Sequence, residues 1–216
     1  MDKLIGVKFG GFHSYEDFGL ILSGKSISTP TPKTTTIDIP GGDGVIDLTE
    51  ALGEVKYNNR TISFDFTTFQ YGSKFLELLS KIQTAIHGKK LQICLDADPD
   101  FYYLGRITVK DNKDAGGYGT ISIECDCEPY KYKVRKTCFT EILTGQSVEV
   151  NLSNSKKSVV PIITTTGTCV IAFGEQSWFV GIGEFYNPDI LLTEGSNFMT
   201  LVGNCTVTIE YQEGVL

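Results

Sequence analysis

Histidine and tryptophan are scarce in this sequence, and basic residues are fewer than acidic ones. The 216 residues include two histidines, one tryptophan, 19 lysines and arginines and 26 aspartates and glutamates, for a net charge of −7. A nucleic-acid-binding surface normally carries a clustered basic footprint, so this balance argues against one. It does not exclude a protein that DNA passes without binding.

Long apolar runs are also missing. No stretch approaches the length of a membrane span, and the N-terminal MDKLIGVKFGG has no apolar segment of signal-peptide length. We therefore expect a soluble protein made in the cytosol, with no membrane insertion. At 41% hydrophobic residues the chain can bury a core, and its length fits one large or two small domains.

The six cysteines do not form the pattern of a disulfide framework. They are scattered through a chain with no secretory signal, so reduced thiols that are buried or half-buried are expected. The positions are Cys94, Cys125, Cys127, Cys138, Cys169 and Cys205. In a strand, Cys125 and Cys127 would point to one face. A metal site would need two further ligands at matching spacing, and no second pair is present.

Apolar and polar residues alternate with period two over most of the chain. In RTISFDFTTF, Ile62, Phe64 and Phe66 share one face, and KTTTIDI, FYYLGRITVK, GTISIECD and CTVTIEYQ behave alike. These β-branched and aromatic runs, separated by Gly, Asn, Asp and Pro, predict β-strands.

One segment, SKFLELLSKIQTAIHGKK, has helical periodicity instead. It predicts an amphipathic helix over about 73–87 that covers a sheet. Ser73 is the expected N-cap and Gly88 the expected C′ glycine. Lys89 and Lys90 would complement the C-terminal end of the helix dipole.

A change of composition near CEPYKYKVRKTC divides the chain into two predicted domains, 1–131 and 132–216. The helix and the longer strands precede it. Short apolar runs follow it: SVEVNL, SVVPIITT, TCVIAF, SWFVGI, DILLT, FMTLV and CTVTIEY. With no helical crossovers between them, these should pair antiparallel as an all-β sandwich. The predicted fold class is mainly β, with an α+β N-terminal domain that carries the one covering helix.

The glycine-rich stretch IDIPGGDGVIDL, residues 37–48, suggests at first a phosphate-binding loop. A P-loop needs G-x-x-x-x-G-K-[ST] before a helix, and a dinucleotide site needs G-x-G-x-x-G between a strand and a helix. Neither pattern occurs here. The glycines are better explained by a chain reversal between strands, with Asp43 at its tip.

Asp96, Asp98 and Asp100 in LDADPDF resemble the start of a calcium loop. An EF-hand would have Gly at the sixth position and Glu at the twelfth, where this chain has Phe101 and Ile107. We interpret the segment as a polar hairpin turn. The alternative is that the three carboxylates bind a metal ion weakly in another geometry.

His13 stands beside Ser14, Glu16 and Asp17, and sequence alone leaves a Ser–His–Asp arrangement open because triads assemble across a fold. No G-x-S-x-G nucleophile elbow accompanies it. His87 ends the predicted helix, where a histidine can contact the terminal carbonyls.

Trp178, in EQSWFVG, is the only tryptophan. It could stack a sugar ring on a sandwich face, or anchor the core.

Several ordered motifs together resemble the siphophage distal tail protein family. They are the SYEDFGL opening, IPGGDGVIDL, YNNRTISFDF, the IHGKK helix end, DADPDFYYLGR and CEPYKYK, over about residues 10–135. The C-terminal segments VPIITTTG, GIGEFYNPDILLTEGSN and VGNCTVTIEYQEGVL are similar to the family's galectin-like sandwich.

The resemblance implies a structural protein rather than an enzyme, with no catalytic, metal or cofactor-binding residues. Family members form a hexameric ring at the distal end of the tail tube, with a lumen for DNA, at the virion tail tip. The implied partners are other copies of the chain, the tail-tube protein, the end of the tape-measure protein, the tail-associated hub protein and receptor-binding proteins. The alternative hypothesis is a carbohydrate-binding module for host cell-wall sugars.

Overall fold

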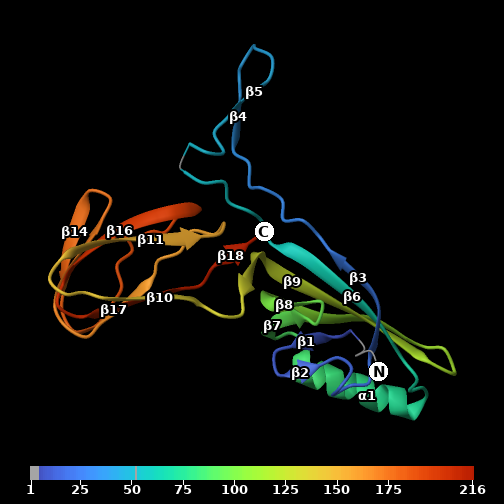
Figure 1. Cartoon of the computed structure of the whole chain (residues 1–216). Helices are drawn as coiled ribbons and strands as arrows, with labels where there is room; N and C mark the ends of the chain where they lie inside the picture. The colour runs from blue at the N-terminus through green and yellow to red at the C-terminus, as the bar shows by residue number, and fades with distance from the viewer. Residues whose placement is uncertain (1–4, 52) are drawn as a thin grey trace. The chain divides into compact units, whose positions relative to one another are not determined.

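The computed structural model describes residues 5–51 and 53–216. They form two compact units, one of Met1–Lys131 with Leu216 and one of Tyr132–Val215, coloured blue to yellow-green and yellow to red in Figure 1. Each unit has its own cluster of buried apolar side chains. Among the described residues no helix is long and apolar enough to cross a membrane.

The first unit is built on an antiparallel sheet in the order β2-β1-β7-β8-β9-β6-β3. Its strands are β1 (Val7–Phe9), β2 (Phe12–His13), β3 (Ile21–Ile27), β6 (Arg60–Thr68), β7 (Lys90–Leu95), β8 (Asp98–Asp114) and β9 (Gly119–Lys133). The predicted alternation is confirmed in β6, where Ile62, Phe64 and Phe66 are buried and the residues between them are half-buried or exposed. Burial of the apolar side chains on this face away from water supplies the main stabilisation of the unit.

Helix α1 (Ser73–Ile86) covers this sheet, as predicted (Figure 1). Its buried stripe is Phe75, Leu78, Ile82 and Ile86. Gly88 has the positive φ of a C′ glycine, 74°. Lys89 donates to two of the last carbonyls of the helix, at 3.0 and 2.7 Å.

Two details of the helix prediction are wrong. Gly72, not Ser73, occupies the N-cap position, with a φ of 61° that serine rarely adopts. Its N–H donates to the carboxylate of Asp114 at 2.6 Å. His87 does not contact the terminal carbonyls through its ring; its Nδ1 accepts the N–H of Val109 at 3.1 Å.

The second unit is a sandwich of two four-stranded sheets, in the orders β10-β17-β12-β15 and β11-β16-β13-β14. The strands are β10 (Thr137–Ile142), β11 (Ser147–Asn154), β12 (Ile162–Thr165), β13 (Cys169–Phe173), β14 (Gln176–Val180), β15 (Gly183–Phe185), β16 (Gly195–Gly203) and β17 (Thr206–Tyr211). Neighbouring strands in both sheets are antiparallel, as expected. Buried residues from both sheets form one core. A short strand, β18 (Gly214–Val215), pairs with β9.

The segment DILLT is not the strand that its apolar residues predict. It makes only an isolated bridge, between Leu192 and Val159. Ile190 and Leu192 are nevertheless buried, so the apolar run serves the core as a loop rather than as a strand.

The six cysteines are free, and Cys125 and Cys127 are both buried on the core face of β9. Cys138 departs from the expectation of burial, since it is exposed.

Candidate functional site

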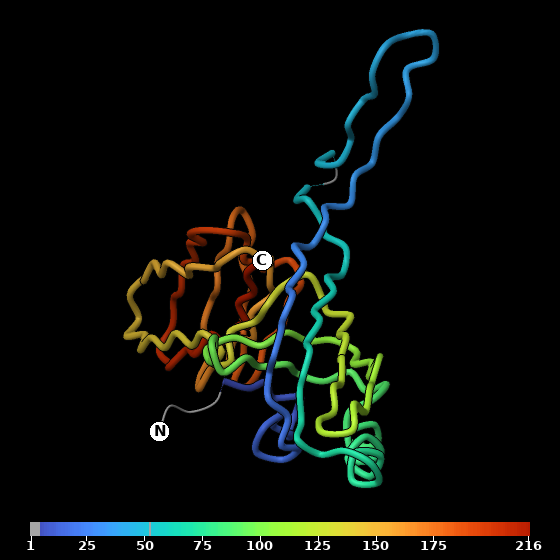
Figure 2. The backbone as a smooth tube through the Cα atoms, turned by 90° about the vertical axis from the view of Figure 1, so that its right-hand side faces the viewer, coloured from blue at the N-terminus to red at the C-terminus, as the bar shows by residue number. Residues whose placement is uncertain are grey.

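The stretch that resembled a phosphate loop forms a projecting two-stranded hairpin. Strands β4 (Thr36–Asp38) and β5 (Val45–Asp47) form a two-stranded antiparallel sheet of their own. Figures 1 and 2 show this hairpin extending well beyond the ends of β3 and β6. We call residues 28–59 the arm. An isolated two-stranded hairpin is marginally stable in water, so this shape favours a contact partner.

The hairpin has one apolar face and one acidic face. Ile37 and Ile46 lie directly opposite each other, and alternation places Ile39 and Leu48 on the same face. All four side chains are exposed, Ile37 to 52% and Ile46 to 50%. The other face carries Thr36, Asp38, Val45 and Asp47. No side chain of the described residues buries the apolar face.

The tip of the hairpin is a turn, and it has no phosphate-loop geometry. Gly41 and Gly44 adopt φ values of 77° and 82°, in the region that favours glycine. Gly42 does not, and its N–H donates to the carbonyl of Ile39 at 3.1 Å. The chain after the tip continues as β5 rather than as a helix. The predicted chain reversal is confirmed.

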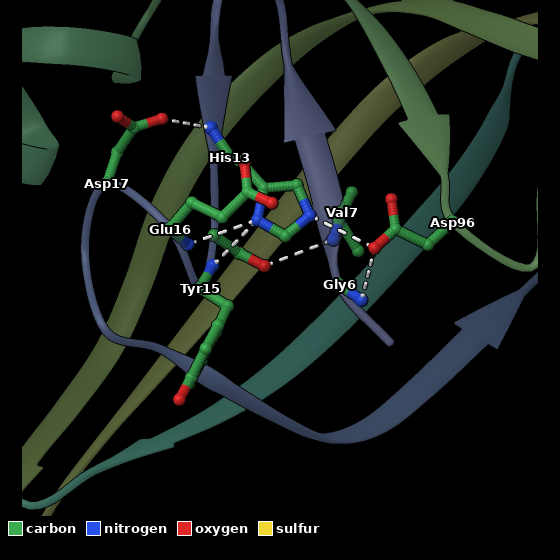
Figure 3. A network of polar contacts seen from close by, with 8 residues as sticks. Gly6, Val7, His13, Tyr15, Glu16, Asp17 and Asp96 are labelled. Atoms are coloured by element: carbon green, nitrogen blue, oxygen red, sulfur yellow. Dashed lines mark hydrogen bonds and ion pairs between the residues drawn. The ribbon is translucent and has the colours of Figure 1, made fainter. Parts of the chain in front are cut away.

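His13 is buried in a polar cluster at the start of the first unit (Figure 3). Its Nε2 lies 3.0 Å from Oδ2 of Asp96, and its Nδ1 accepts the N–H groups of Tyr15 and Glu16 at 3.2 and 3.1 Å. Because Nδ1 accepts, the proton of the neutral ring is on Nε2, which donates to Asp96. The same Asp96 oxygen accepts the N–H of Gly6 at 3.0 Å.

This geometry does not fit a catalytic triad. A triad base must have a free nitrogen facing the serine, with the carboxylate on the other nitrogen. In His13 both nitrogens are engaged, one by the carboxylate and one by backbone N–H groups. Ser14 is fully buried, and its Oγ accepts the N–H of Val7 at 3.0 Å. The cluster therefore fastens β1 to the following turn and to the end of β7.

The surface hollow beside α1 does not reach this cluster. It has a volume of about 920 Å³ and lies against residues 17–19, residues 69–72 and one side of the helix from Ser73 to Lys81. His13, Ser14 and Asp96 are not among the residues that line it.

Of the three aspartates of LDADPDF, Asp96 lies in the predicted hairpin turn between β7 and β8, whereas Asp98 and Asp100 belong to β8. Asp96 faces His13, whereas Asp98 pairs with Lys131, whose Nζ lies 2.7 Å from its Oδ2. Asp100 is exposed. Among the described residues no three His, Cys, Asp or Glu side chains are placed to hold a metal ion.

A second polar cluster, around Glu213, had no signal in the sequence. Its carboxylate is buried and accepts hydrogen bonds from Lys133 at 2.5 Å, Thr137 and Ser155. Burial alone would raise the pKa of Glu213, but these hydrogen bonds and the lysine charge outweigh it and hold the pKa below its ordinary value. The residues come from three separate segments of the second unit, so no local spacing reveals them.

Trp178 belongs to the core side of its sheet. It lies opposite the buried Ile171 and packs against the core of the second unit. Phe179, the next residue along β14, is the exposed aromatic, at 75%. The tryptophan is therefore not presented for stacking on a sugar ring.

Comparison with solved structures connects this architecture with a phage protein. A crystal structure of SPP1 Dit, described as a paradigm of the hub adsorption apparatus in phages that infect Gram-positive bacteria, superposes with a TM-score of 0.71. The match covers 99% of this chain and 100% of that one, at 14% sequence identity. The chain has the fold of SPP1 Dit. No family model and no curated protein sequence matches it.

Proposed function

We propose that this chain is a structural protein of a phage tail that forms a ring, of six copies, at the distal end of the tail tube. The observation that carries the proposal is the end-to-end likeness of both units to SPP1 Dit. A likeness confined to one unit would have been compatible with many functions, because folds are shared between unrelated functions. Here the order and extent of both units agree.

The arm supports self-association. Covering a half-exposed isoleucine or leucine yields about 1 kcal/mol, so the four apolar side chains of one face could contribute several kcal/mol to a contact. A ring requires head-to-tail contacts between two different surfaces of the same chain. A projecting hairpin with one apolar face suits such a contact. In this proposal the arm packs on the next copy.

The acidic composition is compatible with a DNA conduit. With a net charge of −7 per chain, six copies repel the DNA backbone rather than bind it. DNA would pass through the lumen without specific recognition.

We assign ring formation to the first unit and outward contacts to the second, which we regard as galectin-like. The expected partners are the tail-tube protein, the end of the tape-measure protein, the tail-associated hub protein and receptor-binding proteins, and the expected location is the virion tail tip. The proposal includes no cofactor, metal or catalytic step. A carbohydrate-binding function lacks support, because Trp178 faces the core.

Light scattering and negative-stain microscopy of the purified chain test ring formation. We expect a species of about six times the 23.7 kDa chain mass, with six-fold averages and a central opening. Because a ring can require its partners to close, the experiment is repeated with the co-expressed tail-tube protein. A monomer under both conditions would contradict the proposal.

A further inference from the structure

The first unit exposes apolar surface at two opposite ends. One end is the arm, with its face of Ile37, Ile39, Ile46 and Leu48. The other end lies beside the start of α1, where Phe69 is 76% and Tyr71 54% exposed. Figures 1 and 2 both show the arm and α1 at opposite ends of the sheet, so the arm cannot reach the helix of its own chain.

The surface beside α1 is concave. Phe69 and Tyr71 line the hollow of about 920 Å³, together with the buried side chains of Phe18 and Leu78. Protein clefts of about 300–1,000 Å³ hold ligands of drug size, so this one has room for aliphatic side chains of a hairpin. Aromatic side chains that become buried in such hollows supply much of the binding energy of protein interfaces.

The charges of the two surfaces also suit each other. Residues 34–54 of the arm contain no lysine or arginine, and they carry five acidic residues: Asp38, Asp43, Asp47, Glu50 and Glu54. The helix presents Lys74 and Lys81 to the hollow, with Glu77 between them. Lys81 is held in place, because its Nζ donates to the carbonyl of Asp17 at 2.9 Å and lies over the ring of Phe18. Complementary charge of this kind steers two surfaces into one register.

We propose that the hollow beside α1 receives the apolar face of the arm of a second copy of this chain. The inference rests on the proposed self-association and adds the surface that receives the arm. Because donor and acceptor surfaces differ, the contact is head-to-tail, and each copy keeps one of each free until a ring closes. If another protein or a small apolar ligand fills the hollow instead, the experiments below give a different result.

Cysteine cross-linking tests the contact in the full chain under the conditions in which it assembles. Cys138→Ser serves as the parent, because it removes the exposed thiol. Ile46→Cys in the arm and Gln70→Cys at the hollow are introduced together, both at exposed positions. With a mild oxidant we expect a ladder of covalent oligomers on a non-reducing gel, ending at the closed ring.

Controls for the cross-link use the same chain. Ile46→Cys alone and Gln70→Cys alone should give no ladder, because each lacks the second thiol. Val45→Cys combined with Gln70→Cys is the matched control, since Val45 is equally exposed on the other face of the hairpin. It should give no ladder either.

The outcomes separate this inference from the proposed ring. Rings in light scattering without a ladder would overturn the docking site and leave the ring in place. A ladder that lengthens without closing would support the docking site and contradict the ring. Dimers formed by either single variant would show a two-fold contact and overturn the head-to-tail arrangement.

Substitution of the aromatic side chains provides an independent measurement. Phe69→Ser with Tyr71→Ser should weaken assembly about tenfold or more. Adding Ile37→Ser and Ile46→Ser should weaken it little further, because side chains of one contact are not additive. Phe179→Ser is the matched control, since Phe179 is as exposed as Phe69 but lies in the second unit. Normal rings in the Phe69 and Tyr71 variant would overturn the inference.

Two charge reversals on α1 should have opposite effects. Lys74→Glu should weaken assembly and Glu77→Lys should strengthen it, each by up to about fivefold, because exposed ion pairs contribute little. Both residues are exposed and line the hollow. Both differences should shrink as salt is added. Effects of the same sign in the two variants would contradict an acidic occupant.

Discussion

The imidazole of His13 and the carboxylate of Asp96 are joined at 3.0 Å across 83 positions of the chain. With the N–H groups of Tyr15 and Glu16 on the opposite ring nitrogen, this contact makes His13 a clamp between the first strands and the end of β7. In the structure His13 therefore connects segments that are far apart in the chain.

We predict that His13→Ala lowers the free energy of unfolding by about 2–4 kcal/mol. The change removes one partner of the half-buried Asp96 carboxylate and the acceptor of two backbone N–H groups, and polar groups left unsatisfied in such places are costly. Chemical denaturation measures the loss. His87→Ala is the matched control, since His87 is exposed, and it should cost much less. Unchanged stability with lost phage infectivity would instead point to catalysis.

The Glu213 cluster predicts acid sensitivity of the second unit. Because the folded-state pKa of Glu213 is lowered, its contribution is present above the unfolded pKa of about 4.3. That contribution is lost as pH falls through the folded pKa. Glu213→Gln should therefore cost about 3 kcal/mol at pH 7 and progressively less below pH ~4. Thermal unfolding of both proteins from pH 7 to pH 3 checks this.

Glu210→Gln is the control for this experiment. Glu210 lies in the same unit, but its pairing with Lys136 is loose, at 3.9 Å, and exposed. Such surface pairs contribute about 0–1 kcal/mol. If Glu210→Gln matched Glu213→Gln at pH 7, or if the Glu213→Gln difference were constant with pH, the buried network would not be the cause.

Substitutions on the two faces of the arm should affect ring formation differently. Replacing Ile37 and Ile46 by serine should prevent ring formation without a loss of monomer stability, because both side chains are already exposed. Val45→Ser is the matched control, since Val45 is 53% exposed on the other face of the same hairpin. Light scattering measures both. A double variant that assembles like the parent would remove the arm from the contact.

We predict that a side chain is costly at Gly44, in the tip of the arm, and harmless at Gly117. Gly44→Val, alone or with Gly42→Val, forces a β-branched residue to a φ of 82°, at a local cost of about 1–2 kcal/mol. The substitution should distort the hairpin and impair ring assembly. Gly117→Ala, where an added Cβ meets open space and no positive φ is required, should be tolerated. Normal assembly of the Gly44 variant would show that the tip geometry is dispensable.

The sequence patterns predicted the features that depend on residues close together in the chain: the helix, strand β6 and the chain reversal of the hairpin. The spacing of Phe75, Leu78, Ile82 and Ile86 located the helix, and the alternation in RTISFDFTTF located β6. The glycines of IDIPGGDGVIDL indicated a chain reversal because positive φ is a property of single residues. The motifs also suggested the tail-protein resemblance.

Contacts between distant segments could not be predicted in this way. Asp96 looked like a calcium-loop residue until the fold placed it against His13. The Glu213 cluster combines residues up to 80 positions apart. Secondary structure was mispredicted at Leu192 for a related reason. This residue is buried in a loop, and a buried loop can have the same run of apolar residues as a strand.

Immunogold labelling of phage particles that carry this chain tests its central role most directly. An antibody raised against the exposed arm or against an affinity tag should place gold at the end of the tail opposite the capsid. Gold along the tail shaft or on the capsid, or its absence from particles with intact tails, would contradict the proposed position at the distal end of the tail tube.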